Sequence, residues 1–273
     1  ATYRVSKDID DLILINKESG MDHGRATIEG ISHYAVEAAI LKVYGSETLD
    51  YVIDEAVQIH GGMGYSAEMA VERGYRDSRI NRIFEGTNEI NRLIIADTLI
   101  KRAQKGDFDL FGPATQLFNN LETISSGKTD GESYYAEKRR YLANFKKVIL
   151  LTVHGVTSYF SNKLAKEQEV MNNISEMIME TYIAESLALR VEKLDSMKSR
   201  AEIFRDMLDV YLYDTADLVR KSARDAVNSF AGAEESEKLN SAIEKLTLVT
   251  GINVKEARRR IADRLIENNA YKF

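Results

Sequence analysis

Apolar residues recur along the chain at steps of three and four, which is the spacing of residues on one face of an α-helix. Within residues 2–18 this spacing is followed by Val5, Ile9, Leu12 and Ile15. The same period continues, with few interruptions, to the end of the chain. A helical period over almost the whole sequence predicts an all-α protein.

The interruptions divide the pattern into separate predicted helices. Gly45 is expected to end one helix in a left-handed conformation, and Ser46 with Glu47 to begin the next. The expected helices are 2–18, 27–44, 46 to about 60, part of 67–83, 87–105, short helices within 114–125, and then 133–166, 168–198, 200–229, 236–249 and 254–270.

The segment 107–113 is the best candidate for a linker between two helical parts. We therefore expect one bundle over residues 1–109 and a second bundle over residues 110–273. Pro113 is the only proline of the chain, so long uninterrupted helices are possible on both sides. Up-and-down bundles fit this organisation, because short loops join the long helices.

Two stretches with glycine interrupt the helices of the first part. Residues 58–65 read QIHGGMGY, and residues 83–90 read IFEGTNEI. Glycine adopts backbone conformations that other residues avoid, and it allows a ligand to approach the main chain closely. We therefore expect the functional site at these two loops rather than on the regular helices.

The composition argues against several classes of binding partner and functional site. The chain has a formal charge of -6 and contains no cysteine. The negative charge disfavours nucleic acid as a partner, and the lack of cysteine excludes disulfides, thiol nucleophiles and cysteine-bound metals. The four histidines lack the Glu-x-x-His and His-Glu-x-x-His spacings of common metal sites, so no metal site is predicted.

The two glycine loops and the charged segment between them resemble the acyl-CoA dehydrogenase family. Several matching positions within about forty residues are a stronger signal than one glycine motif. The resemblance covers roughly residues 1–105 and is nearest to the very-long-chain branch, which carries a helical extension like the one expected here. The matching residues are Gln58, Gly61, Gly62, Gly64, 71–73, Arg76, Asp77, Arg79, Ile80, 84–90, Arg92 and Leu93, with 44–47 upstream.

The resemblance implies an FAD-dependent enzyme of fatty acid β-oxidation that converts a fatty acyl-CoA to a trans-2-enoyl-CoA. In this family a carboxylate removes the α-proton and the β-carbon gives a hydride to the flavin. Glu85 stands at the position of the catalytic base, and Phe84 and Gly86 match substrate contacts. The residues that match flavin contacts are Gln58, Ile59, His60, Gly61, Gly62, Thr87, Asn88 and Glu89, of which the first five touch the FAD of the neighbouring subunit in the family.

The residues around Glu85 suit such a role but do not decide it. Phe84 can exclude water, which favours the protonated carboxyl group. The start of the following helix has free N–H groups, which favour the carboxylate. These effects oppose each other, and the alternative is a surface glutamate near a helix start.

Two other features have a simpler interpretation than a site. Arg73, Arg76, Asp77 and Arg79 favour a structural ion-pair network over substrate contacts. The apolar stretch 146–153 favours a buried bundle helix over a helix on a membrane surface, so membrane association is not favoured.

The family resemblance also implies partners. It implies electron-transfer flavoprotein as the redox partner, a homodimer, and the cytoplasm of a bacterium or the mitochondrion of a eukaryote. Family members carry an N-terminal helical domain and a β-domain that this sequence lacks, so we expect a C-terminal fragment that is inactive alone. The alternative is a non-catalytic helical interaction module, which would bind no flavin.

Overall fold

The computed structural model describes residues 1–197 and 202–271, and every regular element in these ranges is a helix. This confirms the all-α prediction. The elements are α1 (Thr2–Glu18), α2 (His23–His33), α3 (Ala35–His60), η1 (Gly61–Tyr65), α4 (Ala70–Ile80), α5 (Asn88–Gln104), α6 (Phe111–Asn119), η2 (Leu121–Thr123), α7 (Tyr134–Phe160), η3 (Ser161–Lys166), α8 (Gln168–Ser196), α9 (Glu202–Asn228), α10 (Ala233–Leu246) and α11 (Val254–Asn268).

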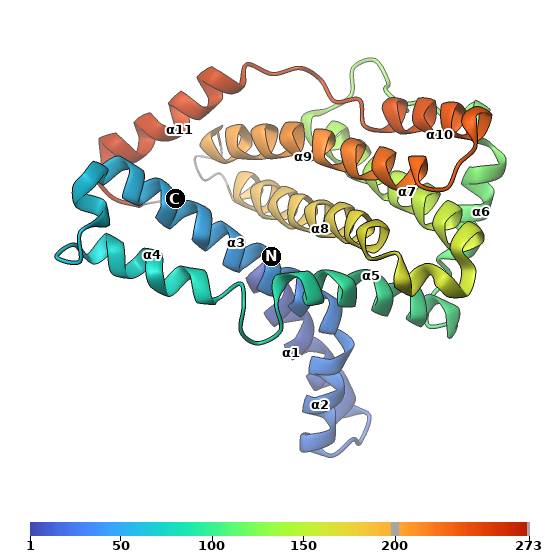
Figure 1. Cartoon of the computed structure of the whole chain (residues 1–273), viewed down its shortest axis with the longest axis horizontal. Helices are drawn as coiled ribbons and strands as arrows, with labels where there is room; N and C mark the ends of the chain where they lie inside the picture. The colour runs from blue at the N-terminus through green and yellow to red at the C-terminus, as the bar shows by residue number, and fades with distance from the viewer. Residues whose placement is uncertain (198–201, 272–273) are drawn as a thin grey trace. The chain divides into compact units, whose positions relative to one another are not determined.

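The chain forms two compact units, Ala1–Lys101 and Arg102–Phe273. In the first unit, α1 and α2 lie side by side as a hairpin, and α3 packs along α4 (Figure 1). The core of this unit comes from residues at helical spacing, among them Val36, Ile40 and Val43 on one face of α3. The long helix α3 is therefore the element that supports both glycine loops.

The predicted helix boundary at Gly45 is wrong. The break lies at Tyr34, between α2 and α3, and α3 continues through Gly45 to His60. A glycine in a helix interior costs about 1 kcal/mol relative to alanine. Burial of Val43 and Ser46, which flank Gly45 on α3, outweighs this local preference.

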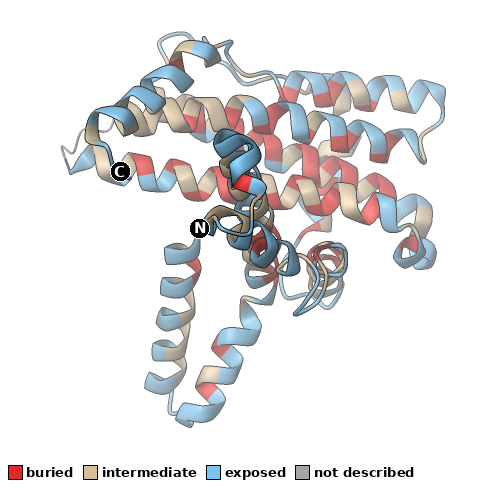
Figure 2. Ribbon diagram, turned by 60° about the vertical axis from the view of Figure 1, so that its left-hand side comes forward, coloured by how far each residue is buried: buried red, intermediate tan, exposed pale blue. Residues whose placement is uncertain are grey.

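The second unit is a bundle in which α7, α8 and α9 pack against one another. The helices α6 and α10 pack on α7, and α11 packs on α9. Figure 2 shows that buried residues concentrate in this bundle, where Phe145, Ile174 and Leu212 are almost completely enclosed. The helix starts predicted at 133, 168 and 254 lie within one residue of α7, α8 and α11, and the start predicted at 236 lies three residues after that of α10. The bounds predicted at 198 and 200 lie outside the described residues.

The apolar stretch 146–153 lies within α7. Val148, Leu151 and Val153 are buried there, as the interpretation of a bundle helix predicts. In the part of the chain that the structure describes, no helix combines the length and the apolar character needed to cross a bilayer.

A cluster of polar side chains ties the start of α7 to α9 and to the loop before α11. Lys138 is buried, and its Nζ lies 2.8 Å from carboxylate oxygens of both Glu137 and Asp209. The hydroxyl groups of Tyr141 and Thr250 donate to Oε1 of Glu137. Burial alone raises the pKa of Glu137, but these donors outweigh it and lower the pKa to about 2.

We expect Glu137→Gln to destabilise the 273-residue chain by about 1–2 kcal/mol at neutral pH, after allowance for solvent screening. A lowered pKa stabilises the fold above the usual value of 4.5, and this stabilisation is lost as the pH falls towards about 2. The difference in free energy of unfolding between wild type and variant should therefore disappear over that pH range. Urea unfolding followed by circular dichroism at several pH values measures it.

The matched control is Glu192→Gln, which removes an exposed pair with Arg139. Exposed pairs contribute little, so this variant should keep the stability of the wild type. If the free energies of unfolding of Glu137→Gln and wild type differed by the same amount at all pH values, the lowered pKa of Glu137 would not be the source of the stabilisation.

Candidate functional site

The first glycine loop begins in the last turn of α3 and continues through η1. Gly61 has φ 59° and ψ -147°, a conformation open essentially to glycine alone. The side chains of Gln58, Ile59 and His60 precede it and are exposed. No atom lies within 4 Å of the position that a Cβ on Gly61 or Gly62 would take, so the backbone is open to a ligand here.

The second glycine loop is a tight turn before α5. Glu85 and Gly86 have φ angles of 56° and 81°, both in the left-handed region. This conformation costs a residue other than glycine about 1–2 kcal/mol. Strain of this kind persists only where the surroundings hold it, and it is common at active sites.

The start of α5 is capped by Thr87. The backbone N–H of Ile90 donates to Oγ1 of Thr87 at 3.3 Å. The pKa of Glu89 is lowered by its own backbone N–H and then by the Thr87 hydroxyl. Glu89 is therefore favoured as a carboxylate in the first turn of α5, where the helix dipole also favours a negative charge.

Asn88 is the only residue of the turn without exposed surface. Its Oδ1 accepts from Nζ of Lys42 at 2.7 Å and from Oγ of Ser46 at 3.1 Å. Its Nδ2 donates to Ser46 and to Oε1 of Glu47. With its side-chain amide fully used inside the chain, Asn88 supports the turn, and its flavin contact stays a prediction.

Lys42, Ser46 and Glu47 lie on one face of α3 and were not among the predicted site residues. Lys42 also donates to the carbonyl oxygen of Gly86 at 2.6 Å. Glu47 forms a bidentate pair with Arg92 on α5, at 2.7 and 2.8 Å. Burial raises the pKa of Glu47, but Arg92 outweighs this and lowers it. The sequence did contain a signal for these three residues, because the spacing of 42, 46 and 47 places polar groups on one face of a largely apolar helix.

The charged segment on α4 does not form the predicted ion-pair network. Of its four residues, only Arg76 has an ion pair among the described residues, to Glu72 at 2.9 Å. Arg73, Asp77 and Arg79 are exposed. A cavity of about 510 Å³ lies beside the first loop, and it is lined by Val57, Gly64, Tyr65, Ala67, Glu72, Tyr75, Arg76 and Arg79.

Within one chain the two glycine loops are far apart. The second loop meets α3 at Lys42, Ser46 and Glu47, whereas the first loop begins eleven to sixteen residues later at Gln58. At the helical rise per residue this is roughly 16–24 Å along α3. Glu85 is exposed, and Phe84 beside it is 47% exposed. The apolar cover expected over Glu85 is therefore not supplied by this chain alone.

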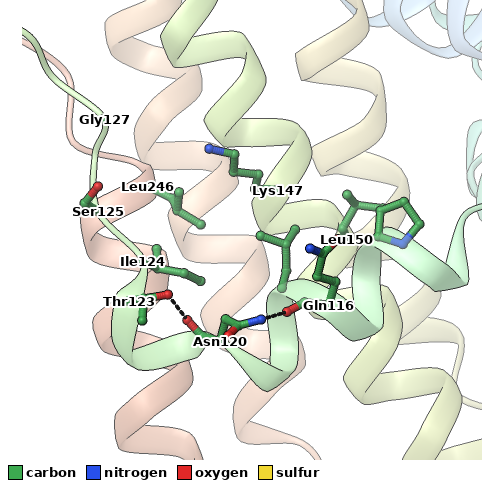
Figure 3. Close-up of a pocket in the computed structure, with 11 residues that line it drawn as sticks. Gln116, Asn120, Thr123, Ile124, Ser125, Gly127, Lys147, Leu150 and Leu246 are labelled. Atoms are coloured by element: carbon green, nitrogen blue, oxygen red, sulfur yellow. Dashed lines mark hydrogen bonds between the residues drawn. The ribbon is translucent and has the colours of Figure 1, made fainter.

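The second unit has a cavity of about 540 Å³ between α6, α7 and α10 (Figure 3). Lys147, Leu150 and Leu246 line one side of it. The side-chain amide of Asn120, the residue that directly follows α6, donates to the carbonyl oxygen of Gln116 at the end of that helix. None of the predicted site residues lies here. In the described ranges, no group of three or more acidic or histidine side chains is placed to hold a metal ion.

Comparison with known proteins relates both units to one family. Two family models, each described as "Acyl-CoA dehydrogenase, C-terminal domain", match residues 18–100 and residues 144–245. The chain belongs to the acyl-CoA dehydrogenase family. The first match contains both glycine loops, and the second lies within the bundle of the second unit.

Individual acyl-CoA dehydrogenases support this membership. A probable acyl-CoA dehydrogenase of Bacillus subtilis is 36% identical over 91% of this chain and 42% of its own length. A solved acyl-CoA dehydrogenase of Bacillus anthracis, complexed with FAD, is 34% identical with a TM-score of 0.94, over 99% of this chain and 46% of its own. The chain thus spans less than half of the length of these relatives.

The predicted very-long-chain branch is matched over only part of the chain. The rat mitochondrial very long-chain specific acyl-CoA dehydrogenase is 54% identical, but over 41% of this chain and 16% of its own length. The match to that branch therefore covers less than half of this chain.

Proposed function

We propose that this chain forms the C-terminal part of an FAD-dependent acyl-CoA dehydrogenase of fatty acid β-oxidation, which oxidises a fatty acyl-CoA to a trans-2-enoyl-CoA. The observation that carries the proposal is the strained left-handed conformation of Glu85 at the start of α5. The family membership and the FAD bound in the related structure support it. The remaining wall of the site would come from other parts of the enzyme.

Glu85 is the proposed base that accepts the α-proton of the thioester. This proton is only weakly acidic, so a positioned carboxylate and a polarised thioester carbonyl are both required. Gly86 follows directly and allows the backbone to lie against the substrate. The exposed face of Phe84 is available to cover the acyl chain and to exclude water once substrate is bound.

The first glycine loop fits the pyrophosphate of a dinucleotide. Gly61 and Gly62 leave their backbone open, and N–H groups of such a turn bind anionic oxygens at close range. Gln58, Ile59 and His60 continue this surface on α3. Thr87 and Glu89 belong to the second loop and are proposed to contact the flavin end. When bound, FAD would accept the hydride from the β-carbon.

The distance between the two loops favours a homodimer. A single chain separates them by roughly 16–24 Å along α3, so the first loop of one subunit would serve the site of its partner. We further propose electron-transfer flavoprotein as the acceptor of the electrons. The expected compartment is the cytoplasm for a bacterial protein and the mitochondrion for a eukaryotic one.

The two bundles are proposed to have different roles. Residues 1–109 would form the catalytic C-terminal domain, and residues 110–273 the helical extension that the very-long-chain branch also carries. Burial of the apolar stretch in α7 leaves it unavailable for membrane attachment.

The experiment compares the full-length protein with the 273-residue chain. We expect the full-length protein to show flavin absorbance that is bleached by a fatty acyl-CoA, and the chain alone to show no turnover, because it lacks most of the site. A full-length protein without flavin would favour the helical interaction module instead. Turnover by the chain alone would contradict the proposal that other parts of the enzyme complete the site.

A further inference from the structure

The carbonyl group of Gly86 is held by two donors from different helices. Nζ of Lys42 on α3 donates to it at 2.6 Å, and Nδ2 of Asn91 on α5 donates to it at 2.9 Å. The Gly86 carbonyl is part of the backbone that follows Glu85 directly. The two bonds therefore restrict rotation of the backbone that carries the Glu85 side chain.

Lys42 provides the stronger of the two restraints. Its ammonium group is charged, and charge-assisted hydrogen bonds are about twice as strong as neutral ones. The same Nζ also donates to Oδ1 of Asn88 at 2.7 Å, so one cation bridges two successive parts of the turn. Lys42 is half-buried and sits on the long helix α3, which gives it a rigid base.

We propose that Lys42 is a positioning residue for Glu85, acting through the Gly86 carbonyl. Among the described residues no ion pair joins Lys42 to Glu85, so its effect passes through the backbone rather than through the carboxylate. The inference rests on the proposed function of Glu85 as the base. It predicts that loss of the ammonium group slows proton abstraction while the fold and the flavin site are kept.

The fold should survive this loss. Without Lys42, the Gly86 carbonyl still accepts from Asn91, and Asn88 still bonds to Ser46 and Glu47. The turn would remain in place but with more freedom at Glu85. A misplacement of about 1 Å at a reacting group can cost roughly 100-fold in rate.

The test uses Lys42→Met in the full-length protein. We expect kcat to fall roughly 10- to 100-fold, with flavin content, KM and thermal unfolding close to wild type. An α-deuterated acyl-CoA should then show a larger isotope effect on kcat, because proton abstraction has become slower. Lys42→Arg, whose guanidinium can donate to both acceptors, should recover most of the rate.

Lys101→Met is the matched control, because Lys101 pairs with Asp97 on the exposed face of α5, away from the turn. It should behave as wild type. Asn91→Ala removes the other donor to Gly86 and should also lower kcat, which tests the same carbonyl independently.

Two outcomes would overturn the role of Lys42 without affecting the proposed role of Glu85. The first is an unchanged kcat and isotope effect in Lys42→Met while Glu85→Gln is inactive. The second is an equal loss of flavin and folding in Lys42→Met and Lys42→Arg, which would show a purely structural role. Full activity of Glu85→Gln would instead refute the proposed base, and the role of Lys42 with it.

Discussion

Replacement of Glu85 by glutamine in the full-length protein is expected to lower kcat by about 10²- to 10⁴-fold, the usual contribution of a positioned general base. Glutamine has nearly the same shape but its amide cannot accept the α-proton. The left-handed φ of 56° is as costly for glutamine as for glutamate, so the turn should not change. Flavin should therefore remain bound.

Rapid-mixing measurements of flavin bleaching by a saturated acyl-CoA check this result. Exchange of the α-proton with deuterated solvent gives a second readout that does not need hydride transfer. Asp97→Asn is the matched control, because it converts a carboxylate to an amide in a surface pair on α5. Wild-type α-proton exchange in Glu85→Gln would assign the base to another residue.

Gly64→Ala is expected to destabilise the 273-residue chain by about 1–3 kcal/mol, the cost of overfilling a well-packed position. Gly64 belongs to the first glycine loop and is buried in η1. A Cβ there would lie 2.6 Å from the carbonyl oxygen of Val57 and 2.8 Å from Cβ of His60. The main chain of α3 cannot move as a flexible side chain would, so the loop must shift. Urea unfolding measures the loss.

Gly62→Ala provides the comparison within the same loop. Gly62 is exposed, and nothing lies within 4 Å of the position of its added methyl group. Stability should stay within about 0.5 kcal/mol of wild type, whereas flavin binding by the full-length protein should weaken if the ligand approaches this backbone. Equal stability losses in both variants would show that the close packing around Gly64 is not the cause of its loss.

The sequence by itself determined most of the helices and the location of the two loops. The period in 2–18 predicted α1 with the observed bounds, and the residues 87–105 predicted α5 to within one residue. Both results follow from local information, because helix hydrogen bonds join residues four apart and an apolar face recurs every three or four residues. The family motif at 58–93 is equally local, and it was sufficient to identify the family.

Tertiary structure alone decided how the turn around Glu85 is held. The bonds of Gly86 and Asn88 to Lys42 and Ser46 join residues more than forty positions apart. It also decided that α3 continues through Gly45, because burial on both sides outweighs a local preference of about 1 kcal/mol. Contacts between helices depend on how their faces meet in space, and a pattern read along the chain does not contain that information.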